Sequence, residues 1–127
     1  MNTLDKRKLN LLVHLAKVDG RFDHSEQELL KTFIREKGLS ENLLEAEEQP
    51  IHFQEGDPQE HRTELLYWAL KLMHADGVVH PREITFCENL ADQLRFKKEI
   101  VSSFVEGPVP SYNIFEDTAK QFMNPDY

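Results

Sequence analysis

The sequence predicts a single all-α domain of about seven helices, and three observations lead to this fold class. Leu, Ile, Val and Phe recur at steps of three and four residues in several segments, which is the period of a helix with one buried face. No segment shows the two-residue alternation, rich in β-branched residues, that a strand needs. The chain has 127 residues, of which 39% are apolar, enough for one hydrophobic core. We therefore expect one domain over residues 1–127.

The first two helices are predicted from an apolar stripe and from the residues that interrupt it. Leucines at helical spacing predict a helix over residues 3–19, and Gly20 ends it because glycine readily takes the left-handed conformation that follows a helix. Asp23 and Glu26 have the N-cap and N3 spacing of a helix start. The second helix should then run to Gly38.

The middle of the chain is predicted to hold a short helix, a linker and a central helix. Ser40 has the position of a cap for the short helix, and residues 49–57 carry Pro and Gly without apolar period, as a linker does. Pro58, at the first helical position, starts a helix that runs to residue 76. Residues 65–73 are apolar almost all round, so this helix should form the middle of the core. The side chains expected to be deepest are Trp68 and Leu72.

The last third of the chain is predicted to hold one longer helix and two shorter ones. Pro81 at the first helical position and Glu83 at the third start the longer helix. Two apolar patches follow, and Gly107 separates them. The first patch contains Ile100, Val101, Phe104 and Val105, and the second contains Ile114, Phe115, Ala119, Phe122 and Met123.

The sequence also repeats itself at an offset of 57 residues. The first DG dipeptide, at Asp19, falls on the second, at Asp76, and Glu26 falls on Glu83. Each copy therefore predicts a helix, a DG turn and a second helix. Two copies favour a duplicated hairpin packed about a pseudo-two-fold axis over a solenoid, which needs at least three stacked repeats. The copies span about residues 3–39 and 60–96, and residues 97–123 add the shorter helices.

These duplicated acids are the candidate functional residues. Glu26 and Glu83 complement the positive end of a helix dipole. Asp19 and Asp76, expected in a last helical turn, face the negative end at a cost of about 0.3–1 kcal/mol, which something must offset. One explanation is that each aspartate accepts hydrogen bonds from backbone N–H groups of its own turn. The other is that the four carboxylates share calcium or magnesium, although the spacing is not that of an EF-hand.

A helix that ends in DG, with a glutamate seven residues after the aspartate, occurs twice and resembles the TerB-like family. That family is named for a tellurite-resistance protein and also occurs in a DnaJ-like co-chaperone. The resemblance covers residues 9–96 and is closer in the second copy, from Met73 to Glu83. It implies an all-α bundle of about seven helices. It also implies that the metal ligands are Asp19, Glu26, Asp76 and Glu83. No J-domain signature follows, so the co-chaperone's role is not implied.

Composition narrows the possible partners and location. The formal net charge is −8, which repels phosphate backbones, so nucleic acid is not an expected partner. The longest mainly apolar stretch, residues 65–73, is about half of the roughly 20 residues that cross a membrane, and no export signal is visible.

Cys87 is the only cysteine, which excludes an intramolecular disulfide and suits a reducing cytoplasm. We expect it to be a small core side chain.

The sequence therefore predicts a non-catalytic binding or stress-response module whose partner is a protein or a divalent cation. His74 and His80 flank the second DG turn, but no adjacent cysteine, HExxH pattern or nucleophile arrangement accompanies them, so we do not expect an enzyme. Two alternatives stay open. One is a structural scaffold or homodimer whose acids only cap helices, and the other is a metal-dependent hydrolase. The expected cofactor is calcium or magnesium, or none.

Overall fold

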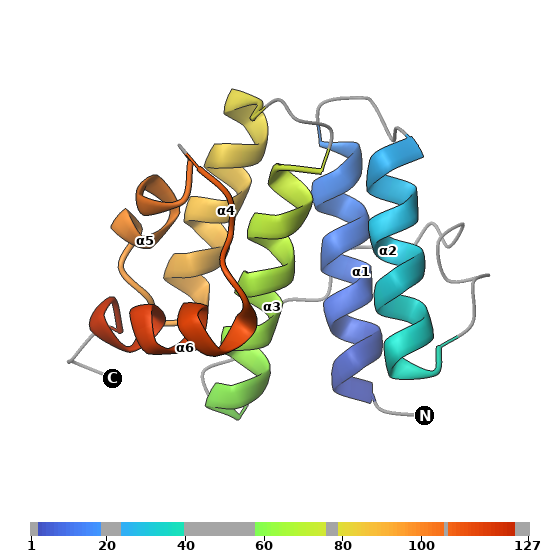
Figure 1. Cartoon of the computed structure of the whole chain (residues 1–127), viewed down its shortest axis with the longest axis horizontal. Coiled ribbons are helices and arrows are strands. Elements are labelled where there is room, and N and C mark those ends of the chain that lie inside the picture. The colour runs from blue at the N-terminus through green and yellow to red at the C-terminus, as the bar shows by residue number, and fades with distance from the viewer. Residues whose placement is uncertain (1–2, 19–23, 40–57, 76–78, 106, 124–127) are drawn as a thin grey trace.

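The computed structural model describes residues 3–18, 24–39, 58–75, 79–105 and 107–123. Within these ranges it contains six α-helices and no strand, which confirms the all-α class (Figure 1). The only strand-like pairing there is an isolated bridge between Phe96 and Met123. The helices are α1 (Thr3–Lys17), α2 (His24–Lys37), α3 (Gln59–Met73), α4 (Pro81–Gln93), α5 (Glu99–Ser103) and α6 (Tyr112–Gln121).

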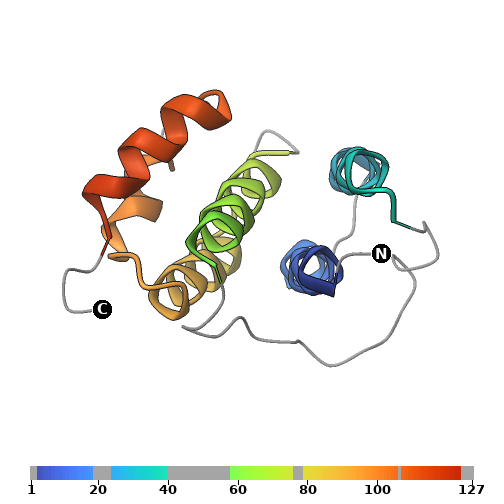
Figure 2. The ribbon, with the colours of Figure 1, turned by 90° about the horizontal axis from the view of Figure 1, so that it is seen from below.

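The first four helices form two antiparallel hairpins that stand side by side. α1 and α3 run in one direction and α2 and α4 return in the other, while α6 crosses the lower part of α3 (Figure 1). Seen from below, α3 lies between α1 on one side and α4 and α6 on the other (Figure 2). Among the described helices, none has both the length and the apolar character needed to cross a membrane.

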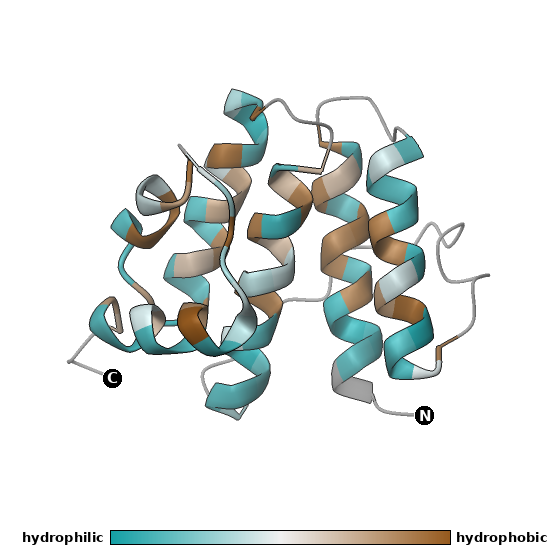
Figure 3. Cartoon of the chain, viewed as in Figure 1, coloured by the Kyte–Doolittle hydropathy of each residue, from teal (hydrophilic) through white to brown (hydrophobic). Residues whose placement is uncertain are grey.

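α3 occupies the middle of the core, as the sequence predicted. Leu72 is 1% exposed, and Trp68 is also buried, with its ring centroid 5.1 Å from that of Phe33 in an edge-to-face contact. The neighbouring helices pack their apolar faces against α3. Brown and teal bands alternate along α1, α2 and α4, as expected for helices with one apolar face (Figure 3).

Residues 57 apart in sequence have similar surroundings in the two hairpins. Leu15 and Leu72 are both buried. Gly38 and Arg95 both have positive φ, at 67° and 70°, and each ends its hairpin's second helix in the left-handed conformation. In both hairpins the next backbone N–H then donates to a carbonyl five residues earlier, Leu39 to Ile34 and Phe96 to Ala91. A duplicated hairpin would give these offsets, and the duplication with its pseudo-two-fold axis stays a prediction.

Several details differ from the sequence prediction. The described ranges hold six helices instead of about seven, because the helix expected after Ser40 and the linker over 49–57 lie outside them. Pro58 is the N-cap residue of α3 instead of its first helical residue. Ile114, expected in an apolar patch, is 58% exposed, whereas Phe115 beside it is buried. A helix of ten residues has room to bury only one narrow face, and Ile114 lies off that face.

Candidate functional site

The two glutamates of the predicted metal site are both buried. Glu26 lies in the first turn of α2 and is 3% exposed, and Glu83 lies in the first turn of α4 and is 2% exposed. The imidazole Nε2 of His80, the N-cap residue of α4, lies 4.0 Å from Glu83 Oε1. A glutamate that only complements a helix dipole can do so from the surface, so burial at corresponding positions distinguishes these two glutamates from ordinary helix-start acids.

The two aspartates, Asp19 and Asp76, lie outside the described residues. The helices before them end sooner than predicted, α1 at Lys17 and α3 at Met73. The prediction that each aspartate stands in a last helical turn, with the helix-dipole penalty derived from it, concerns residues outside the described ranges. Within the part of the chain that the structure describes, no cluster of three or more His, Cys, Asp or Glu side chains is arranged to hold a metal ion.

The helix ends that flank the two DG dipeptides lie at one end of the bundle (Figure 1). Val18 directly precedes Asp19 in the sequence. Val18 lines a cavity of about 370 Å³ together with residues of α4. The α4 residues that line it are Pro81, Arg82, Thr85, Phe86 and Asn89. The residue that follows α1 therefore lines the same cavity as the first turns of α4, on a face of α4 that does not include Glu83.

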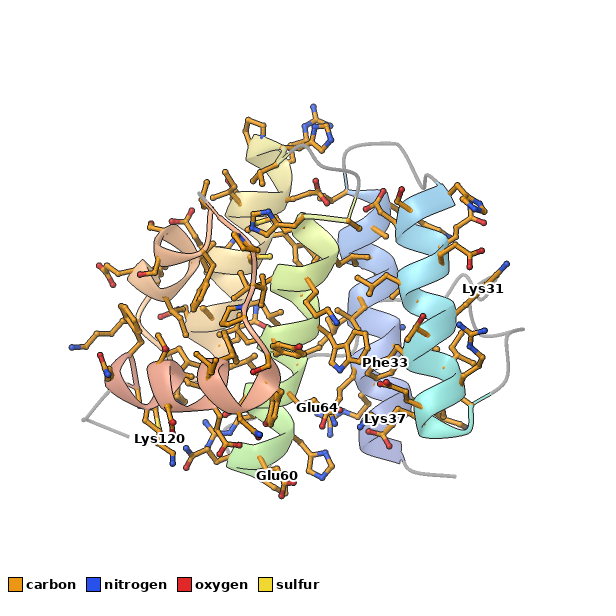
Figure 4. All side chains as sticks on the ribbon, viewed as in Figure 1. Lys31, Phe33, Lys37, Glu60, Glu64 and Lys120 are labelled. Atoms are coloured by element: carbon orange, nitrogen blue, oxygen red, sulfur yellow. The ribbon has the colours of Figure 1, made fainter. Side chains whose placement is uncertain are left out.

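A buried charge cluster, which we call the Lys8 cluster, joins three helices near the other end of the bundle. Lys8 is fully buried, and its ammonium lies 3.0 Å from Asp5 Oδ1 and 3.3 Å from Glu64 Oε1. Glu64 also lies 2.5 Å from the ammonium of Lys37, and the two side chains point toward one another (Figure 4). The cluster comprises Asp5, Lys8, Lys37 and Glu64 and ties α1 to α2 and α3.

Beside the Lys8 cluster lies a cavity of about 290 Å³, which we call the α2–α3 groove. Three of its lining side chains are aromatic. The ring centroid of Tyr67 lies 5.2 Å from that of Tyr112, and the ring of Trp68 also contacts that of Tyr67, edge to face. The ammonium of Lys71 lies 4.7 Å from the Trp68 ring centroid and 5.3 Å from that of Tyr67. The groove is lined by Thr32, Glu36, Lys37, Glu64, Tyr67, Trp68, Lys71 and Tyr112.

Two tyrosines of the groove titrate above their ordinary range. Burial, followed by the negative charges of Glu116 and Glu64, raises the pKa of Tyr112 to about 12. Burial, followed by the charge of Glu36, raises the pKa of Tyr67. Both hydroxyls therefore stay protonated and uncharged near neutral pH, so the charges of the groove come from its lysines and glutamates alone.

Sequence reasoning missed the Lys8 cluster, although one signal was present. Lys8 stands four residues after Leu4 and three before Leu11, on the apolar stripe of α1. A lysine on such a stripe is buried only with partners, and its partner Glu64 is 56 residues away in sequence. Position on the stripe indicates burial, but the packing of α3 against α1 is needed to identify the acid.

Cys87 is fully buried, as predicted, with its Sγ 3.9 Å from the carbonyl oxygen of Ala69. Burial and then the charges of Glu83 and Glu88 raise the pKa of the thiol, which disfavours the reactive thiolate. We expect dithionitrobenzoate to leave Cys87 unmodified in the folded protein and to modify one thiol per chain in denaturant. Rapid modification under native conditions would show that α4 does not pack on α3 at this position.

No protein-family model, curated protein or solved structure matches the chain.

Proposed function

We propose that the chain is a non-catalytic TerB-like binding module that holds a calcium or magnesium ion through Asp19, Glu26, Asp76 and Glu83. The observation that carries the proposal is the burial of Glu26 and Glu83 at corresponding positions of two hairpins. A buried carboxylate must be compensated by hydrogen bonds or by positive charge. Both glutamates already interact within the chain, and a hard cation with oxygen ligands would add positive charge beside them.

A cavity lined by residues of both hairpins supports a shared site. Val18 lines a cavity with Pro81 and Arg82, and Asp19 is the next residue after Val18. Four carboxylates would overcharge one divalent ion in isolation, and His80, 4.0 Å from Glu83, would relieve part of the repulsion when protonated.

Thermal melts in chelator and in millimolar calcium or magnesium test this proposal. A cation present at about 100 times its Kd stabilises the native state by about 2.7 kcal/mol, so the melting temperature of the parent protein should rise by several degrees. Asp76→Asn and Glu83→Gln should abolish the rise. Each should also leave the metal-free protein equally stable or more stable, because it removes a negative charge from a crowded cluster.

Asp92→Asn is the matched control, because Asp92 is an exposed acid at the opposite end of α4. It should preserve the metal response. Capping alone predicts the reverse pattern, with no metal response and a loss of about 0.5–2 kcal/mol when a capping acid is removed. Parent melts that coincide in chelator and in metal would reject the cation and leave a structural scaffold.

A further inference from the structure

The α2–α3 groove contains two charges of opposite sign that form no ion pair. Lys37 and Glu64 form an ion pair, and the ammonium of Lys8 lies 3.3 Å from Glu64 Oε1. Lys71 on α3 and Glu36 on α2 also line the groove, yet neither forms an ion pair with any described residue. The groove is therefore lined by a cation on α3 and an anion on α2, together with aromatic side chains.

The position of Lys71 keeps its charge available to a ligand. Its ammonium lies over the rings of Trp68 and Tyr67, at 4.7 and 5.3 Å from their centroids, and these contacts hold it at the groove. A ring face does not neutralise an ammonium, so a carboxylate can still pair with it. The opposite wall carries Glu36, which is exposed and close enough to Tyr67 to affect its ionisation.

We propose that the α2–α3 groove binds a free α-amino acid with an apolar side chain. The carboxylate of the ligand pairs with the ammonium of Lys71, and its ammonium pairs with the carboxylate of Glu36. The apolar side chain lies against the rings of Tyr67 and Tyr112. A cavity of about 290 Å³ is at the lower end of the range for ligand pockets, which suits a small molecule better than a peptide. This site is separate from the proposed cation site and does not depend on it.

Trp68 provides the readout, because it lines the groove and is the only tryptophan in the chain. The parent protein is titrated with L-phenylalanine, with 3-phenylpropionate, which lacks the ammonium, and with phenethylamine, which lacks the carboxylate. L-Phenylalanine should shift the Trp68 emission and should bind at least about tenfold more tightly than either analogue, since each loses one charge-assisted contact. Amide resonances of α2 and α3 should shift in parallel.

Variants then assign each contact. Lys71→Met should remove the preference for L-phenylalanine over phenethylamine, and Glu36→Gln should remove the preference over 3-phenylpropionate. Lys31→Met and Glu28→Gln are the matched controls, because Lys31 and Glu28 pair at 3.7 Å on α2 and Lys31 points away from the groove (Figure 4). Both controls should bind as the parent does.

Equal binding of the three probes by the parent protein would overturn the proposal, because charge recognition would be absent. The proposal would also be overturned if L-phenylalanine changed neither the Trp68 emission nor the amide resonances of the groove. Both outcomes concern the parent protein, so they hold even if a variant fails to fold.

Discussion

Lys8→Ala is expected to lower the free energy of unfolding by about 3–5 kcal/mol, because it removes one partner of a buried ion pair and leaves the other without compensation. Lys8 is fully buried, 3.0 Å from Asp5 and 3.3 Å from Glu64. Glu64 would keep Lys37 as a partner at 2.5 Å, so the uncompensated charge would be that of Asp5, which is itself buried. Urea denaturation of the parent and the variant measures the loss.

A double replacement separates charge from packing in this prediction. Lys8→Met keeps most of the volume and loses the charge, so it should also destabilise the protein. Adding Asp5→Leu should recover most of that loss, because apolar residues of similar volume can replace a buried ion pair at little cost. Lys6→Ala, at an exposed lysine two residues earlier, should stay within about 0.5 kcal/mol of the parent. A comparably small effect of Lys8→Ala would mean that Lys8 is in solvent.

Leu72→Ala should cost about 2–5 kcal/mol, the range for deleting a buried leucine side chain. Leu72 is 1% exposed and lies on α3, which contacts α1, α4 and α6, so no single neighbour can move to fill the cavity. Ile114→Ala on α6 is the control, because Ile114 is 58% exposed and should change stability by less than about 0.5 kcal/mol. Equal effects of the two substitutions would show that α3 is not at the centre of the core.

The helices could be predicted because their signals are local. The apolar run of α3 places Trp68 and Leu72 in the core whatever surrounds them. Pro81 fixes the start of α4, since a proline at the first helical position needs no backbone donor. Helix boundaries are less well defined by local sequence, and α1 and α3 both end before the DG dipeptides at which the sequence predicted their ends.

Features that depend on tertiary contacts could not be predicted in the same way. The sequence shows that Lys8 is on an apolar stripe, but not that Glu64, 56 residues later, reaches it. It shows the apolar character of Ile114, but not that α6 turns this residue to solvent. For the candidate cation site, the positions of the glutamates followed from helix-start patterns, whereas their burial required the packing of two hairpins.

Titration calorimetry with calcium and with magnesium measures cation binding itself, without reference to stability. We expect a saturable heat for one ion per chain in the parent protein. The double variant Glu26→Gln, Glu83→Gln should give none, and Asp92→Asn should match the parent. No saturable heat from either ion in the folded parent protein, or the same heat from the double variant, would contradict the claim that these buried acids hold a divalent cation.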